Sequence, residues 1–243
     1  MEGTEVNRSE PPRSIKISEI VARQVLNEIA SQGLEVGARL PPEAVMLQKY
    51  GVARGSLREA LRVLEFQGFI RIRPGVGGGP VVRAVSTHDF ARVSSMFFHR
   101  AGATIEELFD ARMSLEAQMA AHAARFRDPE LMRQLRLNVE QDLEQDAGVR
   151  DFHDIITGLS GNRVLNLLAR SIKDMYAERV REVKFTDATR AEVLAAHRDI
   201  ANAIFAGDEA RASDVMKEHM AHYFQLAVVN NMPNLLSEVI DWH

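Results

Sequence analysis

The chain has 243 residues, 46% of them apolar and 26% charged, a composition typical of a globular protein rather than of a disordered or fibrous one. It contains no cysteine, which excludes disulfide bonds and thiolate metal sites and fits a reducing compartment. No apolar run approaches the roughly twenty residues that a membrane span requires. We therefore expect a cytoplasmic protein without a membrane segment.

Charge is divided unevenly along the chain. Residues 1–84 hold 12 Lys and Arg against 9 Asp and Glu, whereas residues 85–243 hold 18 against 25. The length suffices for two domains with separate cores. We expect a flexible leader over 1–14, a first and more basic domain over 15–84, a second domain over 88–232, and a C-terminal tail over 233–243.

The first domain begins with an amphipathic helix over residues 17–29 and continues with two helices separated by a turn at Gly51. The helix after the turn has an apolar side, formed by Leu57, Ala60, Leu61 and Leu64. Arginines recur every four residues on its other side, at Arg54, Arg58 and Arg62. This pattern predicts a DNA-binding helix-turn-helix, in which Arg54 and Arg58 lie nearest to the base edges.

A glycine-rich hairpin follows these helices. Residues 69–73 alternate apolar with basic side chains and predict a strand, with Val81 and Val82 on its partner. The connecting loop, 74–80, has so few side chains that it can approach a phosphate backbone or a minor groove as a wing. The alternative is a nucleotide-binding loop, but Pro80 replaces the last glycine of the dinucleotide pattern, and no Gly-Lys-Ser/Thr follows.

Residues 15–83 resemble the winged helix-turn-helix of the GntR regulators. The motifs that carry the resemblance are Leu40-Pro41-Pro42-Glu43, Tyr50-Gly51-Val52-Ala53-Arg54, Leu57-Arg58-Glu59-Ala60-Leu61, Leu64, Gly68-Phe69-Ile70 and Gly75. The resemblance implies that Arg54, Arg58 and the wing residue Gly75 contact double-stranded operator DNA. We also count Arg39, Gly55 and Ser56 among the expected DNA-binding residues.

Three positions depart from the family pattern. Ala53 and Gly55 stand where the family usually has Ser or Thr, and Ala44 stands where a polar or basic residue is common. Without a hydroxyl, Ala53 cannot cap the helix that it precedes, and two phosphate contacts are lost. Arg54 and Arg58 are therefore expected to provide more of the binding.

The second domain contains helical periodicity and no strand pattern. We expect six or seven helices, with a break at Gly148, over 88–100, 104–126, 129–147, 149–160, 162–185, 187–206 and 209–231. The predicted fold is mainly α, with a winged helix-turn-helix followed by an all-α bundle.

Histidines are the informative residues of the second domain. His197 and His219 lie on the apolar faces of neighbouring predicted helices, and His153 lies on a third. Buried histidines of this kind can be core residues with hydrogen-bond partners. If the three converge, they instead suit a divalent ion such as zinc or nickel, with positions open for an anionic ligand.

This half of the chain resembles the FCD ligand-binding domain of the FadR-like branch of the GntR family. The matching motifs are Leu108-Phe109-Asp110-Ala111-Arg112, Leu115-Glu116, Phe152-His153, Gly161-Asn162, His197-Arg198, Ala203-Ile204, Gly207-Asp208 and His219. The resemblance implies a homodimer in which one carboxylate and three histidines hold a metal beside a small organic acid.

His153, His197 and His219 match the three histidine positions, but the carboxylate position of the family falls on Val149. A valine cannot bind a metal, so water, an effector carboxylate, Asp146, Asp151 or His222 would have to replace that ligand. Arg112 matches a family position that faces the pocket and is expected to bind the effector carboxylate. The alternative for Arg112 is a salt bridge to Glu116, four residues later.

Together these features predict a ligand-responsive transcriptional regulator that binds a palindromic operator as a dimer. The family resemblance favours repression. One alternative is a metal-dependent enzyme built on the three histidines, although no H-E-x-x-H or nucleophile-elbow motif is present. Another is a constitutive DNA binder whose helical bundle serves only for dimerisation.

Overall fold

A computed structural model divides the chain into two units, Met1–Ser86 and Thr87–His243. It describes residues 15–75, 77–141, 146–177, 179–180, 186–225 and 234–242, although the side chains of 141 and 146–151 are excluded. Each unit has a hydrophobic core of its own. The leader expected over 1–14 lies outside the described residues.

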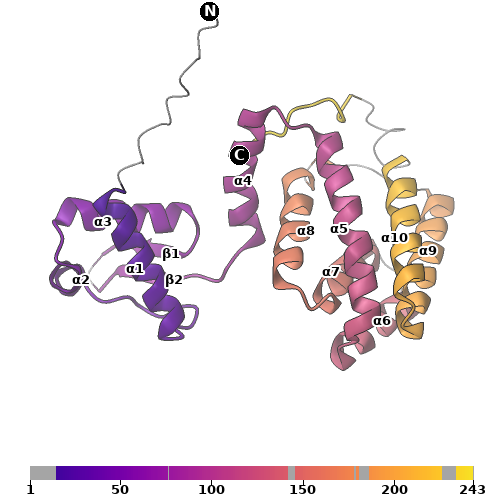
Figure 1. The fold of residues 1–243 in the computed structure, drawn as a ribbon, viewed down its shortest axis with the longest axis horizontal. Helices are drawn as coiled ribbons and strands as arrows, with labels where there is room; N and C mark the ends of the chain where they lie inside the picture. The colour runs from indigo at the N-terminus through magenta and orange to yellow at the C-terminus, as the bar shows by residue number, and fades with distance from the viewer. Residues whose placement is uncertain are drawn as a thin grey trace, which may run out of the picture. The chain divides into compact units, whose positions relative to one another are not determined.

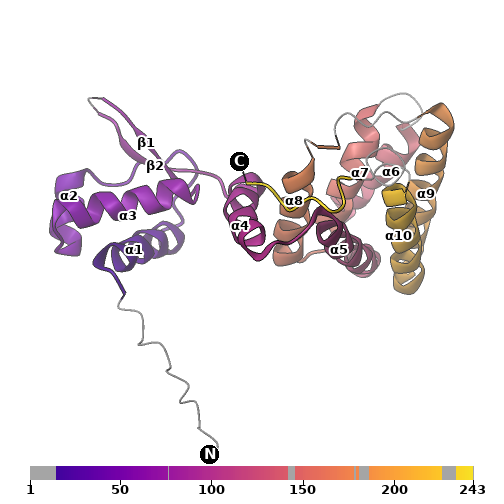
Figure 2. The ribbon, with the colours of Figure 1, turned by 90° about the horizontal axis from the view of Figure 1, so that it is seen from above.

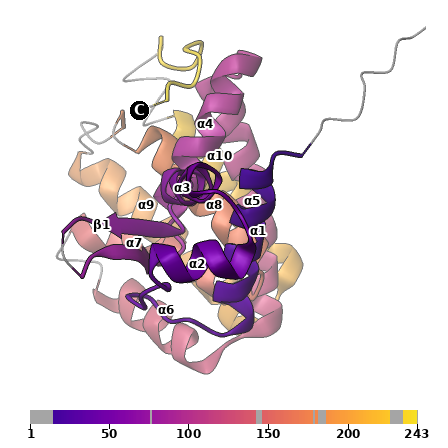
Figure 3. The same ribbon diagram turned by 90° about the vertical axis from the view of Figure 1, so that its left-hand side faces the viewer.

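The first unit consists of three helices and a hairpin: α1 (Ile17–Ser31), α2 (Glu43–Tyr50), α3 (Arg54–Phe66), β1 (Ile70–Arg73) and β2 (Gly79–Val82). Figure 3 shows α3 nearly end-on, flanked by α1 and the hairpin. Leu57, Ala60, Leu61 and Leu64 on α3 are all buried in the core of this unit. Gly51 takes a left-handed conformation (φ 63°) that ends α2, as the sequence pattern predicts.

The hairpin is antiparallel and projects from the helices as a two-stranded wing (Figure 2). Its register pairs Ile70 with Val82 and Arg73 with Gly79. Residues 37–40 run along the other edge of β2, where Leu40 N–H donates to Pro80 O at 2.9 Å. A Cβ atom at Gly78 would lie 2.2 Å from Arg73 O, so the closing turn of the wing has room only for glycine at this position.

The second unit is a bundle of seven helices in its described part: α4 (Thr87–Ala101), α5 (Ile105–Phe126), α6 (Pro129–Gln141), α7 (Asp146–Leu159), α8 (Arg163–Tyr176), α9 (Asp187–Ala206) and α10 (Glu209–Phe224). The long helix α5 stands in the middle, with α8 on one side and α10 and α9 on the other (Figure 1). It also contacts α7, so side chains from four neighbouring helices can meet those of α5.

This architecture confirms the predicted fold class, a winged helix-turn-helix followed by an all-α bundle. The break predicted at Gly148 is wrong, because α7 begins at Asp146 and continues through that glycine. A single glycine lowers helix propensity by only about 1 kcal/mol, which a helix tolerates. Helix α8 ends at Tyr176 rather than near 185.

The C-terminal segment is more than the tail expected from the sequence. Within its described part, 234–242, Leu235 and Ile240 are buried in a cluster with Ile105 and Leu108 of α5. Ile240 N–H donates to Ala103 O at 2.9 Å, and Ile105 N–H donates to Glu238 O at 3.0 Å. The segment therefore covers the start of α5. Among the described helices, none is long and apolar enough to cross a membrane.

Candidate functional site

The exposed side of α3 presents the arginines that the sequence singles out. Arg54 and Arg58 have side chains that are mostly exposed, and both reach Glu43 at the start of α2. Arg54 Nε lies 3.1 Å from Glu43 Oε1, and Arg58 Nη2 donates to Oε2 at 3.3 Å. Exposed ion pairs of this kind add little stability. They place two guanidinium groups side by side at the start of α3.

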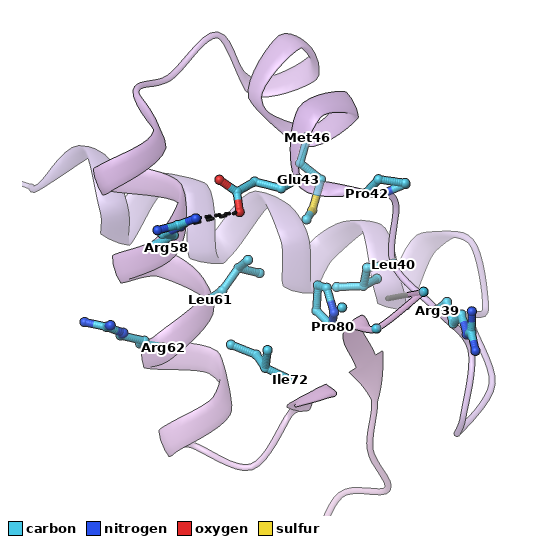
Figure 4. Close-up of a pocket in the computed structure, with 13 residues that line it drawn as sticks. Arg39, Leu40, Pro42, Glu43, Met46, Arg58, Leu61, Arg62, Ile72 and Pro80 are labelled. Carbon is cyan, nitrogen blue, oxygen red and sulfur yellow. Dashed lines mark hydrogen bonds and ion pairs between the residues drawn. The ribbon is translucent and has the colours of Figure 1, made fainter. Parts of the chain in front are cut away.

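A cavity of about 700 Å³ lies between α3 and the wing (Figure 4). Its floor is largely apolar, whereas Arg39, Arg58 and Arg62 bring positive charge to its edge. Gly77, Gly78 and Gly79 of the wing line the other side. The predicted residues Gly55 and Gly75 are exposed, and Ser56 is half-buried in the first turn of α3. Ala53 makes no side-chain cap at that end of the helix, as its methyl group dictates.

The three histidines converge in the bundle from three different helices. His153 lies on α7, His197 on α9 and His219 on α10. His219 Nε2 lies 3.2 Å from His197 Nε2 and 3.4 Å from His153 Nε2. His197 and His219 are buried, and the ring of Phe152 stacks on that of His197 with centroids 3.8 Å apart. We call these three residues the histidine cluster.

The spacing of the histidine cluster fits a divalent metal ion. Zinc–nitrogen bonds of about 2.0–2.1 Å in a tetrahedral site place the ligand nitrogens about 3.3 Å apart. The two distances at His219 match this value, and one nitrogen of each of the three rings lies within 4.8 Å of the others. Three imidazoles leave at least one coordination position for a further ligand.

A buried ion-pair network adjoins the histidine cluster. Glu116 of α5 contacts His153 Nδ1 through Oε2 and accepts a hydrogen bond from Arg112 Nε through Oε1 at 2.5 Å. Arg112 also donates from Nη1 to the hydroxyl of Tyr176 on α8. Both members of the Arg112–Glu116 pair are almost fully buried. The network therefore connects α5, α7 and α8 through charged side chains.

Burial and charge set the protonation of these groups. Burial lowers the pKa of His219 to about 3, and the neighbouring His153 adds to this effect. Burial likewise holds the pKa of His197 well below its usual value. For Glu116, burial alone would raise the pKa, but Arg112 and His153 outweigh it and hold the pKa well below the ordinary range. At neutral pH the site thus combines neutral His197 and His219 with an ionised carboxylate.

The structure brings His153, His197, His219 and Arg112 into one region, as the sequence predicts. The suggested substitute His222 is elsewhere, since its Nε2 lies 3.2 Å from Glu192 Oε2 on an exposed surface. The side chains of Val149, Asp146 and Asp151 are outside the described residues. Sequence reasoning missed the contact of Glu116 with His153 and the contact of Tyr176 with Arg112.

Comparison with known proteins identifies both units. The family model for bacterial regulatory proteins of the gntR family matches residues 17–78, and the FCD domain model matches residues 107–222. The chain belongs to the GntR family of regulators. It combines the GntR helix-turn-helix with an FCD domain, and the two matches contain the arginines of α3 and the histidine cluster, respectively.

Relatives support this assignment over most of the chain. The "Putative L-lactate dehydrogenase operon regulatory protein" of Escherichia coli is 29% identical over 220 residues, covering 85% of this chain and 84% of its own length. An uncharacterized HTH-type transcriptional regulator of Mycobacterium tuberculosis is 27% identical, covering 87% and 89%. A GntR structure from Streptococcus agalactiae shares the fold with a TM-score of 0.64, at 23% identity and with 84% and 97% covered.

These relatives are transcriptional regulators, and so is this GntR-family chain. The alternative of a metal-dependent enzyme is thereby set aside. The histidine cluster lies within the residues that match the FCD domain.

Proposed function

We propose that this GntR regulator is a dimeric repressor that binds a palindromic operator and senses a small carboxylate, together with a divalent metal, at the histidine cluster. The observation that carries the proposal is the convergence of three imidazole nitrogens beside the buried Arg112–Glu116 pair. Such a site binds an anion and a cation together. The alternative in which the bundle serves only for dimerisation gives no role to this arrangement.

His153, His197 and His219 would hold the metal, for which zinc and nickel suit the imidazole ligands. When bound, the metal supplies a Lewis-acid position that accepts a carboxylate oxygen. Arg112 would bind the second carboxylate oxygen, because a guanidinium has five N–H donors and its contacts with Glu116 and Tyr176 use only part of them. L-lactate is the first acid to test, since the Escherichia coli relative is named for an L-lactate dehydrogenase operon.

For DNA binding, we assign base-edge contacts to Arg54 and Arg58, with Gly55 and Ser56 at the same end of α3. Arg39 and Gly75 would contact the backbone from the wing side. A twofold dimer would present two such helices to half-sites about one turn of DNA apart. The exposed aromatic residue Phe97 on α4, with a relative accessibility of 72%, offers apolar surface that a second copy can cover.

The DNA-binding assignment is tested by selecting operator sequences from a pool of random duplexes with the purified protein. An inverted repeat is expected. Arg54→Ala or Arg58→Ala should weaken binding to the selected operator by about 1–3 kcal/mol, measured by fluorescence anisotropy at fixed salt. Arg23→Ala, at an exposed position of α1, is the matched control. Equal operator affinity of the α3 variants and the control would contradict the assignment.

The sensing assignment is tested by thermal-shift titrations with L-lactate and other small acids, each with and without zinc or nickel. We expect stabilisation by the metal and further stabilisation by one acid, and both should disappear in His197→Ala. Transcription in vitro from a promoter that contains the operator gives the sign of regulation. A wild-type protein that takes up no metal and responds to no acid would leave the bundle with dimerisation alone.

A further inference from the structure

Glu116 contacts both Arg112 and His153, a member of the histidine cluster. Its Oε1 accepts from Arg112 Nε on the same helix, whereas its Oε2 contacts His153 Nδ1 on α7. The Glu116 side chain is only 4% exposed, so water hardly competes for either oxygen. A buried carboxylate with two charged or polar partners is held in one orientation. Because Glu116 is fixed in one orientation, its contact with Nδ1 also fixes the orientation of the His153 ring.

The contact with Glu116 determines which nitrogen of His153 carries a proton. An ionised carboxylate accepts hydrogen bonds and donates none, so Nδ1 of His153 must be the N–H donor. In the neutral ring, Nε2 then has a free lone pair. This Nε2 lies 3.4 Å from His219 Nε2, inside the histidine cluster. Glu116 thus leaves Nε2 as the nitrogen of His153 that can bind an ion.

Among the residues that the structure describes, the ring of His197 lacks a carboxylate partner of this kind. His197 Nδ1 is buried and has no hydrogen-bond partner in the described part of the chain. The ring is held instead by stacking on Phe152, with an interplanar angle of 8°. Stacking fixes the plane of a ring but leaves its two nitrogens interchangeable by a flip. Among the described side chains, Glu116 is the carboxylate that contacts a ring nitrogen of the histidine cluster.

We propose that Glu116 is a positioning residue of the histidine cluster: from α5 it holds His153 in the Nδ1–H tautomer, turns Nε2 toward a divalent cation, and places a negative charge directly behind that ligand. The inference rests on the metal site of the proposed function. It goes beyond that function because it assigns the site a fourth side chain that does not touch the ion. Carboxylates behind histidine ligands orient the ring and increase its basicity.

The first test is a titration of the full-length protein with zinc in a competing chelator. Glu116→Gln keeps the size of the side chain but removes its charge, and should weaken zinc binding by about 10–100-fold. Glu192→Gln is the matched control, because Glu192 contacts a histidine, His222, at the surface. Glu192→Gln should bind zinc as the wild type does. Zinc affinity of Glu116→Gln within about twofold of the wild type would overturn the proposal.

The second test uses metal-free protein and so does not depend on the proposed function. Nitrogen NMR of the histidine rings should show His153 as the Nδ1–H tautomer in the wild type and as a mixture of tautomers in Glu116→Gln. A His153 ring that keeps the Nδ1–H form in the variant would overturn the proposal. If the wild type binds no zinc but the tautomer still depends on Glu116, the metal function fails while the positioning role of Glu116 stands.

Removing the charge of Glu116 leaves Arg112 as a buried cation, so the single variant can lose its fold. The double variant Arg112→Gln/Glu116→Gln removes both charges together and is used with Arg112→Gln as its reference. Arg112→Gln removes one partner of Glu116 but leaves the contact between Glu116 and His153, so the double variant should bind zinc more weakly than Arg112→Gln and lose the Nδ1–H preference of His153. A double variant equal to Arg112→Gln would overturn the proposal.

Discussion

Burial in the fold lowers the pKa values of His197 and His219, so these rings do not take up a proton at the pH at which a histidine ordinarily does. Both rings are more than nine-tenths excluded from solvent, and burial is the first cause of their lowered pKa values. In the unfolded chain a histidine titrates near pH 6.5. In the folded protein the pKa of His219 falls to about 3, so the folded state binds fewer protons than the unfolded state between these values.

The metal-free protein should therefore lose stability on acidification. The contribution of each histidine is fully present above about pH 6.5 and decreases as the pH falls toward the folded pKa, by at most about 1.4 kcal/mol per pH unit. Denaturant unfolding in the presence of a chelator, at pH 7.5 and pH 5.5, measures the loss. His219→Gln should show a smaller loss than the wild type. An equal loss in both proteins would mean that His219 is not kept neutral.

At the scale of helices and strands, local sequence patterns predicted the features that residues near one another in sequence determine. The spacing of Leu57, Leu61 and Leu64 gave the buried side of α3, and Gly51 gave the turn before it. The spacing of Arg112 and Glu116 on one helix similarly suggested their ion pair. These interactions are set by the geometry of a single helix or turn.

Contacts between helices were beyond the reach of such patterns. Glu116 meets His153 across 37 residues, and Arg112 meets Tyr176 across 64, so neither pair has a periodicity that marks it. His197 and His219 were found because they lie on apolar faces, with His153 on a third helix, but the expectation that the three converge on one metal came from the resemblance to a known domain. The break expected at Gly148 was wrong because the low helix propensity of one glycine is a weak signal, and α7 continues through that residue.

Two glycines of the first unit should respond in opposite ways to the same substitution. Gly55 lies in α3 with open space around its Cβ position and no positive φ, so Gly55→Ala should stabilise the helix by up to about 1 kcal/mol. Gly78→Ala places a methyl group 2.2 Å from Arg73 O and should disrupt the wing. Calorimetry of the full-length variants checks both signs. Stabilisation by Gly78→Ala would show that the wing turn adapts to a side chain.

On the scale of the whole molecule, helix α8 connects Arg112, in the proposed sensing site, with Thr87 at the start of the second unit. Tyr176 at its end contacts Arg112, and two residues earlier Asp174 accepts a hydrogen bond from Thr87 Oγ1 at 2.6 Å. Ser171, also on α8, donates to Thr87 O at 3.1 Å. Thr87 is the first residue of the second unit, directly after Ser86. If an acid binds Arg112 as proposed and displaces Tyr176, it would act on the helix that anchors the start of α4.

Removing the anchor should uncouple sensing from DNA binding without abolishing either. Thr87→Val keeps the shape of the side chain but loses the hydroxyl that donates to Asp174. Binding of the acid, measured by calorimetry with the metal present, should stay near the wild-type value because Thr87 is not part of the histidine cluster. The ratio of operator affinities with and without the acid should shrink by about 2–30-fold, corresponding to a coupling of about 0.5–2 kcal/mol.

Thr189→Val makes the same substitution at the start of α9, where Thr189 contacts Thr186, and should leave this ratio unchanged. If Thr87→Val keeps the wild-type ratio, the contact between Thr87 and Asp174 does not couple acid binding to operator binding. The coupling would then have to pass through another contact of α4.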